Sequence, residues 1–460
     1  MRAQPILMAA LVCGAAALPL ARAQMPAPAS NAAAAPAQRL DLLQAWRLAF
    51  ERDPQLKAAR AATAASAERI PQARAQLLPN VGASFSRNLN VLNTTQPNLL
   101  GELSTTQASY SSSNDALTAR QPIYRRPLLA NLRQAGHVVE DARAQLERDT
   151  QQLVTRVALA YFETLLAQEQ IGVLRQQQAA FAAQLDGARK SLVAGSGTRT
   201  DIDAALARVD LSLAQELELR QALELSRRQL QILTDERADE LAAVDVQRMV
   251  LVPPQPDTVD GWMARAEVSS PELRALRAQL EAAREEVNKA QGAHYPTLDG
   301  VAQISRSTSD NVTRLNTTFS QRSVGLQLTV PIYQGGAVDS QVREALARYD
   351  RAEQALEATR RDLLIRLQRE FRGVSEGVLR IRALEQAVRS AEQLVLSSQR
   401  SFEAGVRTRL DILNAEQQLA EARRDLTQAR YVYLNASVRL RALAGDPIEP
   451  SLAEVNAMLK

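Results

Sequence analysis

Polar and apolar residues follow two different periods along this 460-residue chain. Between Val324 and Val330 they alternate residue by residue, which predicts a β-strand with two unlike faces. Between Leu367 and Val395 nine apolar positions divide 28 residues into eight steps, or about 3.5 residues per step. That spacing is typical of a coiled-coil helix. The chain is therefore predicted to combine strands with long helices.

Glycine and proline, which end helices and strands, divide the chain into a few long elements. The run from about 337 to 404 contains only the isolated Gly373 and Gly377, and as one helix it would be roughly 100 Å long at 1.5 Å per residue. No ordinary domain core accommodates that length. We expect strands at about 81–90, 114–121, 298–306 and 323–330, long helices at about 127–194 and 337–404, and return helices at about 201–234 and 411–443.

The same plan occurs twice in the sequence. Residues 194–202 and 404–412 are identical at six of nine positions, with an offset of 210. Pro54 and Pro79 recur as Pro271 and Pro296 at an offset of 217. A duplicated unit of this size is predicted, not a solenoid of short repeats. The expected boundaries are 40–256 for the first repeat, 257–447 for the second and 448–460 for a C-terminal tail.

The first residues have the features of an export signal. Arg2 precedes an almost wholly apolar run from Ile6 to Leu20, and Ala-Arg-Ala at 21–23 is a cleavage site, so 1–23 is expected to be a signal peptide. Residues 24–39, rich in alanine and proline, are expected to be a low-complexity tether. Cys13 is the only cysteine, so the mature chain would have no disulfide and no cysteine-based metal site.

Composition and motifs argue against several classes of function. Removing Arg2 and Arg22 lowers the net charge from +4 to +2, whereas nucleic-acid binding needs a clustered basic surface. The only histidines, His137 and His294, have no carboxylate or cysteine at ligand spacing, so no metal site is expected. The sequence contains no phosphate-binding glycine loop and no nucleophile motif. We therefore expect neither an enzyme nor a cofactor.

The strands of an exported chain suggest a membrane β-barrel. On this interpretation Leu326, Leu328 and Val330 face outer-membrane lipid, while Gln327 and Thr329 face a wet interior. Four strands cannot close a barrel, and open edges in lipid leave backbone groups unpaired, so other chains must complete it. The alternative is that the strands form edge hairpins on a soluble coiled coil.

The sequence resembles the TolC family of trimeric outer-membrane channels. The resemblance depends on the duplicated plan, on Pro-Ile-Tyr at 122–124 and 331–333, and on Ala-Gly-x-x-Thr-x-x-Asp at 194–201 and 404–411. It implies a mainly α fold in which a homotrimer forms a 12-stranded outer-membrane barrel and a coiled-coil α-barrel that extends into the periplasm. It also implies a passive exit duct for type I protein secretion, multidrug efflux or both. A periplasmic adaptor and an inner-membrane ABC, RND or similar transporter would open it.

A rival function remains at this point, that of a soluble periplasmic coiled-coil adaptor or scaffold. It would need no detergent for extraction. The exported substrate, protein or drug, is also left open by the sequence.

Each turn after a long helix has a glycine, then Thr-x-x-Asp. Glycine favours the left-handed residue that ends a helix, and Thr-x-x-Asp is a capping box for the next helix. The resemblance adds that these turns dock the adaptor. The adaptor-docking residues are therefore expected to be Gly195, Thr198, Gly405 and Thr408.

The resemblance also implies a channel constriction at Asp411. In the family a second carboxylate lies one turn further, but this chain has Asn414 there. Links that hold the channel closed would join Arg407 to Thr200 and Asp201, and the assisting tyrosine of the family is Phe402 here. We therefore expect the closed state to depend mainly on Arg407 and Asp201.

Overall fold

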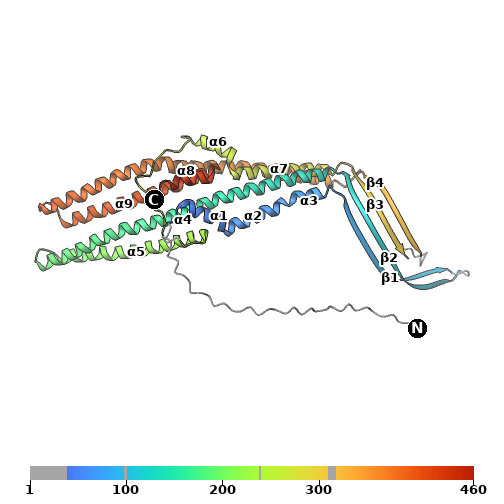
Figure 1. Ribbon diagram of the computed structural model, residues 1–460, viewed down its shortest axis with the longest axis horizontal. Coiled ribbons are helices and arrows are strands. Elements are labelled where there is room, and N and C mark those ends of the chain that lie inside the picture. Colours follow the sequence, from blue (N-terminus) through green and yellow to red (C-terminus); the bar gives the residue numbers. More distant parts are fainter. Residues whose placement is uncertain (1–38, 98–100, 238–239, 309–316) are drawn as a thin grey trace, which may run out of the picture. The chain divides into compact units, whose positions relative to one another are not determined.

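The computed structural model describes residues 39–97, 101–237, 240–308 and 317–460. The predicted signal peptide and nearly all of the predicted tether, residues 1–38, lie outside this range. Figure 1 shows the elements of the first repeat, α1 (Leu42–Arg52), α2 (Pro54–Ala67), α3 (Arg69–Ala75), β1 (Asn80–Pro97), β2 (Leu103–Tyr124), α4 (Arg126–Val193) and α5 (Arg199–Thr234). The second repeat contains α6 (Val259–Ser269), α7 (Pro271–Gly292), β3 (Thr297–Thr308), β4 (Thr318–Thr329), α8 (Ala337–Glu403) and α9 (Arg409–Ala444), and α10 (Ile448–Asn456) follows.

The two long helices, α4 and α8, contain 68 and 67 residues. At 1.5 Å per residue each extends for roughly 100 Å. Each packs against the shorter helix that follows it, so that α4 and α5 form a first helical hairpin and α8 and α9 a second. Within the described ranges, no helix has the length and apolar character needed to cross a membrane.

The four strands form one antiparallel sheet in the order β1-β2-β3-β4. Hairpins within each repeat pair β1 with β2 and β3 with β4, and the β2–β3 pairing joins the two repeats. Among the described residues, β1 and β4 are therefore the edge strands.

The strands are longer than the sequence pattern indicated, except at one end. The first hairpin pairs from Asn80 with Arg120 out to Pro97 with Leu103, beyond the predicted ranges of 81–90 and 114–121. Serine and threonine residues outside the predicted ranges extend the ladder, and the hydroxyls of Thr95 and Thr105 lie 2.8 Å apart across it. Threonine is β-branched and fits a strand even where both faces are polar.

The predicted strand at 323–330 also needs correction at both ends. It begins five residues earlier, at Thr318, and ends at Thr329. Val330 lies just outside β4, because the ladder ends with Thr297 opposite Thr329 and the next residue on the β3 side is Pro296, which has no N–H to donate.

The repeats differ where the first has α2 and α3 but the second has only α7. Pro71 lies within α3 and has no N–H to donate to the carbonyl of Ala67, where α2 ends. No proline occurs at the corresponding place in α7, which continues for 22 residues.

The core lies where α1, α6 and α10 pack around the middle of the long helices. Fully buried side chains in it include Tyr161 and Phe162 of α4 and Leu367 of α8. The segment expected to be a C-terminal tail contains α10, whose Leu452 and Val455 are buried in this core.

Candidate functional site

The first tip, residues 194–201, is a tight turn between α4 and α5. Gly195 has φ +75°, and its N–H donates to the carbonyl oxygen of Leu192 at 3.0 Å. Thr198 begins the next helix: its backbone N–H donates to Asp201 Oδ2 at 3.0 Å, and its hydroxyl accepts from the Asp201 N–H at 3.2 Å. The turn thus has the expected glycine and a complete capping box.

The second tip, residues 404–411, repeats this geometry between α8 and α9. Gly405 has φ +71° and donates to the Phe402 carbonyl at 2.9 Å. Asp411 Oδ2 accepts from the Thr408 N–H at 2.8 Å and from its hydroxyl at 2.7 Å. One oxygen of the Asp411 carboxylate therefore caps its own helix.

Asp411 is held in its ionised form by its surroundings. The hydrogen bond from the Thr408 hydroxyl, then the Thr408 N–H and the charge of Arg407, lower its pKa below the ordinary value of 3.8. Asn414 lies on the same face of α9, one turn further on, and its side chain is exposed. The first two turns of α9 therefore present one charged and one neutral polar side chain.

The residues expected to hold the channel closed lie on both tips. Within the single chain, Arg407 Nη1 donates to the buried Ser398 hydroxyl at 3.4 Å, and no ion pair joins Arg407 to Asp201 within the described part of the chain. Thr200 is exposed at the start of α5, and Phe402 is 36% exposed near the end of α8. Links between these residues in an assembly stay a prediction.

Three polar contacts between the helical hairpins were not predicted. Asn414 accepts from Arg208 of α5 at 3.4 Å, Glu416 accepts from Gln184 of α4, and Glu169 of α4 accepts from Tyr431 at 2.6 Å. The partners are 206, 232 and 262 residues apart. The heptad pattern does not identify them, because it gives the buried face of each helix but not which helix of the other repeat lies alongside.

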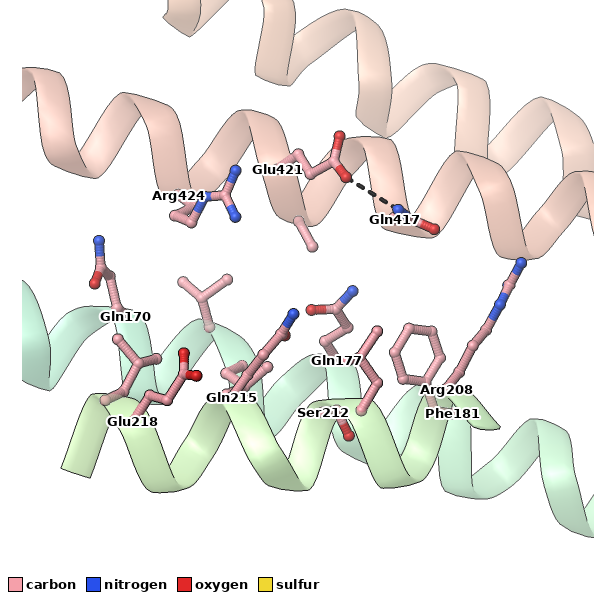
Figure 2. Close-up of a pocket in the computed structure, with 15 residues that line it drawn as sticks. Gln170, Gln177, Phe181, Arg208, Ser212, Gln215, Glu218, Gln417, Glu421 and Arg424 are labelled. Carbon is pink, nitrogen blue, oxygen red and sulfur yellow. Dashed lines mark hydrogen bonds between the residues drawn. The ribbon is translucent and has the colours of Figure 1, made fainter. Parts of the chain in front are cut away.

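A pocket of about 330 Å³ lies between the first helical hairpin and α9. Figure 2 shows Gln170 and Gln177 of α4 and Arg208 of α5 facing Gln417 and Arg424 of α9 across it. Near the tips the two helical hairpins are thus joined by polar contacts beside an open space that polar and apolar side chains line together.

One face of the sheet is apolar and exposed. Paired residues of neighbouring strands share a face, and the pairs Leu117–Ile304, Ala302–Val324, Gly300–Leu326 and Leu298–Leu328 follow one another across β2, β3 and β4. Leu326 is 72% and Leu328 64% exposed. Gln327 and Thr329 alternate with these leucines and so lie on the other face.

In the described part of the chain, titratable residues do not gather into a metal site. The described residues contain no group of three or more His, Cys, Asp or Glu side chains that could hold a metal ion.

The model of the outer membrane efflux protein family matches residues 45–234 and 262–446, one segment in each repeat. The chain belongs to this family. The family is one of transport channels, so this protein is an export channel of the cell outer membrane that extends into the periplasm. The resemblance to the TolC family is thereby confirmed, and the rival function of a soluble adaptor is not supported.

Several relatives cover nearly the whole chain. The alkaline protease secretion protein AprF of Pseudomonas aeruginosa is 34% identical over 91% of this chain and 87% of its own length. The proteases secretion protein PrtF of Dickeya chrysanthemi is 31% identical, covering 92% and 91%. The outer membrane protein TolC of Escherichia coli is 30% identical, covering 92% and 85%.

Solved structures have the same fold. The outer membrane protein VceC of Vibrio cholerae superimposes with a TM-score of 0.76 at 20% identity, over 88% of this chain and 96% of its own. The Neisseria gonorrhoeae MtrE channel, solved in its open state, gives a TM-score of 0.73 at 18% identity, covering 89% of each chain. The predicted class, mainly helical with a small sheet, is confirmed.

Proposed function

We propose that this channel is the exit duct of a type I secretion system and that its cargo is a protein. The observation that carries the proposal is the similarity, over more than 90% of this chain, to two proteins named for protease secretion. Multidrug efflux is the alternative cargo class, and TolC of Escherichia coli is nearly as similar.

We infer that three copies form the duct. The exposed apolar face around Leu326 and Leu328 fits contact with outer-membrane lipid. The edges of β1 and β4 need partners there, because each unpaired backbone group in lipid costs several kcal/mol. Three chains with four strands each give the 12-stranded barrel that the family resemblance implies.

Three Asp411 side chains would then line the periplasmic mouth. At about 6 Å apart, each pair of carboxylates repels by roughly 0.7 kcal/mol in water and about four times more at a partly screened site. Such a ring attracts cations and binds divalent ions. With Asn414 in place of a second carboxylate, we expect weaker divalent block than in a channel with two acidic rings.

We propose that Arg407 holds the mouth closed through Asp201 and Thr200, with no tyrosine hydroxyl to assist because residue 402 is phenylalanine. An exposed ion pair contributes only about 0–1 kcal/mol, which suits a closure that must open. The pocket between the helical hairpins supports such opening, because it leaves open space between α9 and the helices α4 and α5.

The opening signal would come from a periplasmic adaptor and an inner-membrane ABC, RND or similar transporter. The two tips are the proposed docking sites. Gly195 and Gly405 have positive φ and open space around them, and Thr198 and Thr408 begin the return helices beside them.

The cargo class is tested by comparing culture-supernatant proteomes of the parent strain and a strain that lacks this gene. Type I secretion predicts that one or two large proteins disappear from the deletion supernatant and return when the gene is restored. An unchanged supernatant, with increased susceptibility to small toxic compounds, would contradict protein secretion and indicate efflux.

A further inference from the structure

A second pocket, of about 240 Å³, lies where α9 ends and α7 begins, between α4 and α8. At this junction Gly445 abuts Ser269, so closely that a Cβ on Gly445 would overlap the Ser269 carbonyl oxygen. The pocket wall includes Ser270 at the start of α7 and three arginines of the second repeat, Arg366, Arg369 and Arg439. We call it the junction pocket.

In the first repeat, the carboxylate of Asp53 occupies the equivalent junction. Asp53 begins α2, and its Oδ1 accepts from the N–H groups of Gln55 at 2.6 Å and Leu56 at 3.1 Å. Its Oδ2 accepts from Arg156 Nη2 at 3.0 Å. The Asp53 carboxylate is 2% exposed, so this repeat contains a buried anion bound by two amides and a guanidinium.

The same position in the second repeat lacks the anion. The offset of 217 aligns Asp53 with Ser270, and the offset of 210 aligns Arg156 with Arg366. Burial supports the alignment, because Leu56 and its counterpart Leu273 are both 1% exposed. Arg156 also donates to the side chain of Gln55, and Arg366 makes the equivalent contact in the second repeat. Its Nη2 donates to Glu272, the counterpart of Gln55, at 2.8 Å.

The donors of the missing anion are still present. Ser270 is 2% exposed and lines the junction pocket, but its hydroxyl makes no hydrogen bond within the described residues. The α7 amides of Glu272 and Leu273, which correspond to the two amides bound by Asp53, have no side-chain acceptor. The first turn of a helix also attracts negative charge through its dipole.

Positive charge has been added around these donors. Arg369 and Arg439 replace Leu159 and Gln229 of the first repeat, and in the described ranges neither arginine makes a hydrogen bond or a salt bridge. Glu370 replaces Ala160 beside them; burial raises the pKa of its carboxyl, against the charges of Arg439 and Arg369, which lower it. Compared with its counterpart, the junction pocket lacks the Asp53 carboxylate and has gained two arginines. It has also gained two carboxylates, Glu370 and Glu272, of which Glu272 is paired with Arg366.

We propose that the junction pocket binds a small soluble oxyanion, with a carboxylate or phosphate group in the place that the Asp53 carboxylate takes in the first repeat. Ser270, the amides of Glu272 and Leu273, and Arg439 donate to it. Guanidinium groups suit carboxylate and phosphate alike, so both chemistries are accepted. Binding ties the start of α7 to α8 and α9 and stabilises the native state.

The test is thermal unfolding of the full-length protein in detergent, with inorganic phosphate titrated against chloride at constant ionic strength. The unfolding midpoint of the parent should increase with phosphate, because a ligand of the native state stabilises it by mass action. Ser270→Asp supplies the carboxylate from the chain itself, so its midpoint should be higher without phosphate and unresponsive to it.

Arg439→Gln restores the residue of the first repeat, and the concentration of phosphate needed for half the midpoint shift should increase about tenfold, as for loss of one charge-assisted hydrogen bond. Arg380→Gln is the control for loss of an arginine, since Arg380 is exposed on α8, makes no side-chain hydrogen bond or salt bridge with other described residues and does not line the junction pocket. Its phosphate response should equal that of the parent.

A parent midpoint that does not respond to phosphate, or an equal response in Ser270→Asp, would overturn the proposal. If phosphate has no effect and Ser270→Asp dissociates the assembly, an acidic side chain of a second copy fills the pocket instead.

Discussion

Tyr431 of α9 donates a 2.6 Å hydrogen bond to Glu169 of α4, across the boundary between the two repeats. Burial raises the pKa of Glu169 above its ordinary value of 4.5, against the hydrogen bond from Tyr431 and the charge of Arg430, which lower it. Folding therefore shifts the protonation equilibrium of Glu169 toward the neutral carboxyl, relative to the unfolded chain.

A first prediction concerns the pH dependence of this contact. Because the folded pKa of Glu169 is raised, its contribution to stability is fully present below about pH 4.5 and is lost as pH rises through the raised value. Glu169→Gln should thus raise the unfolding midpoint at pH 7, and the gain should vanish toward pH 4. Glu163→Gln, an exposed change on the same helix, is the control. A gain that is constant with pH would contradict the prediction.

A second prediction concerns the Asp411 ring. Asp411→Asn keeps an oxygen that can cap α9 but removes the charge, so cation selectivity and block by a divalent or hexammine cation should both decrease. The measurement is current through single channels with the blocker added on the periplasmic side. Asp210→Asn removes an exposed carboxylate of α5 that belongs neither to the ring nor to the closing links, and this variant should block like the parent. Equal block in Asp411→Asn and the parent would refute the ring.

A third prediction concerns the closed state. Arg407→Ser removes the guanidinium proposed to hold the tips together and should raise single-channel conductance. Arg400→Ser, an exposed change on the last turn of α8, should leave it unchanged. Conductance of Arg407→Ser equal to that of the parent would show that the closure depends on other contacts.

A fourth prediction concerns the junction of α9 and α7. Gly445 has φ +79°, and a Cβ there would overlap Ser269, so Gly445→Ala should lower the free energy of unfolding by about 1–3 kcal/mol. Gly136 lies inside α4 with open space around it, so Gly136→Ala should raise stability by about 0.5–1 kcal/mol. Thermal unfolding of both variants checks the pair, and a neutral Gly445→Ala would contradict the close approach.

Local chemistry explains which parts of the fold were predictable. Gly195 and Gly405 with the following Thr-x-x-Asp mark the tips in the sequence, and both turns have the expected glycine conformation. The long helices end within a residue of the predicted positions, because these signals act within a few residues.

The outer parts of the strands were missed for a physical reason. A stretch such as Thr94 to Thr106 has no alternation of polar and apolar residues, so the hydrophobic periodicity does not predict a strand there. Pairing with the opposite strand, as between Thr94 and Thr106, keeps residues 93–97 and 103–107 extended.

Contacts between the repeats could not be predicted from the sequence. Glu169 and Tyr431 are 262 residues apart, and nothing in either heptad pattern sets the rotation of α4 against α9. Similarly, Ser270 is a serine before a proline, and that pattern gives no sequence signal for a binding site. Its proposed role follows only from the structure, in which its counterpart in the first repeat, Asp53, accepts a hydrogen bond from Arg156.

The central claim, that several copies of this chain form a membrane duct, is tested most directly by single-channel recording of the purified protein in a planar bilayer. Protein extracted with detergent should run as a heat-labile trimer and give discrete, uniform conductance steps. A protein that is recovered without detergent as a monomer, and that gives no steps at any voltage, would contradict the account.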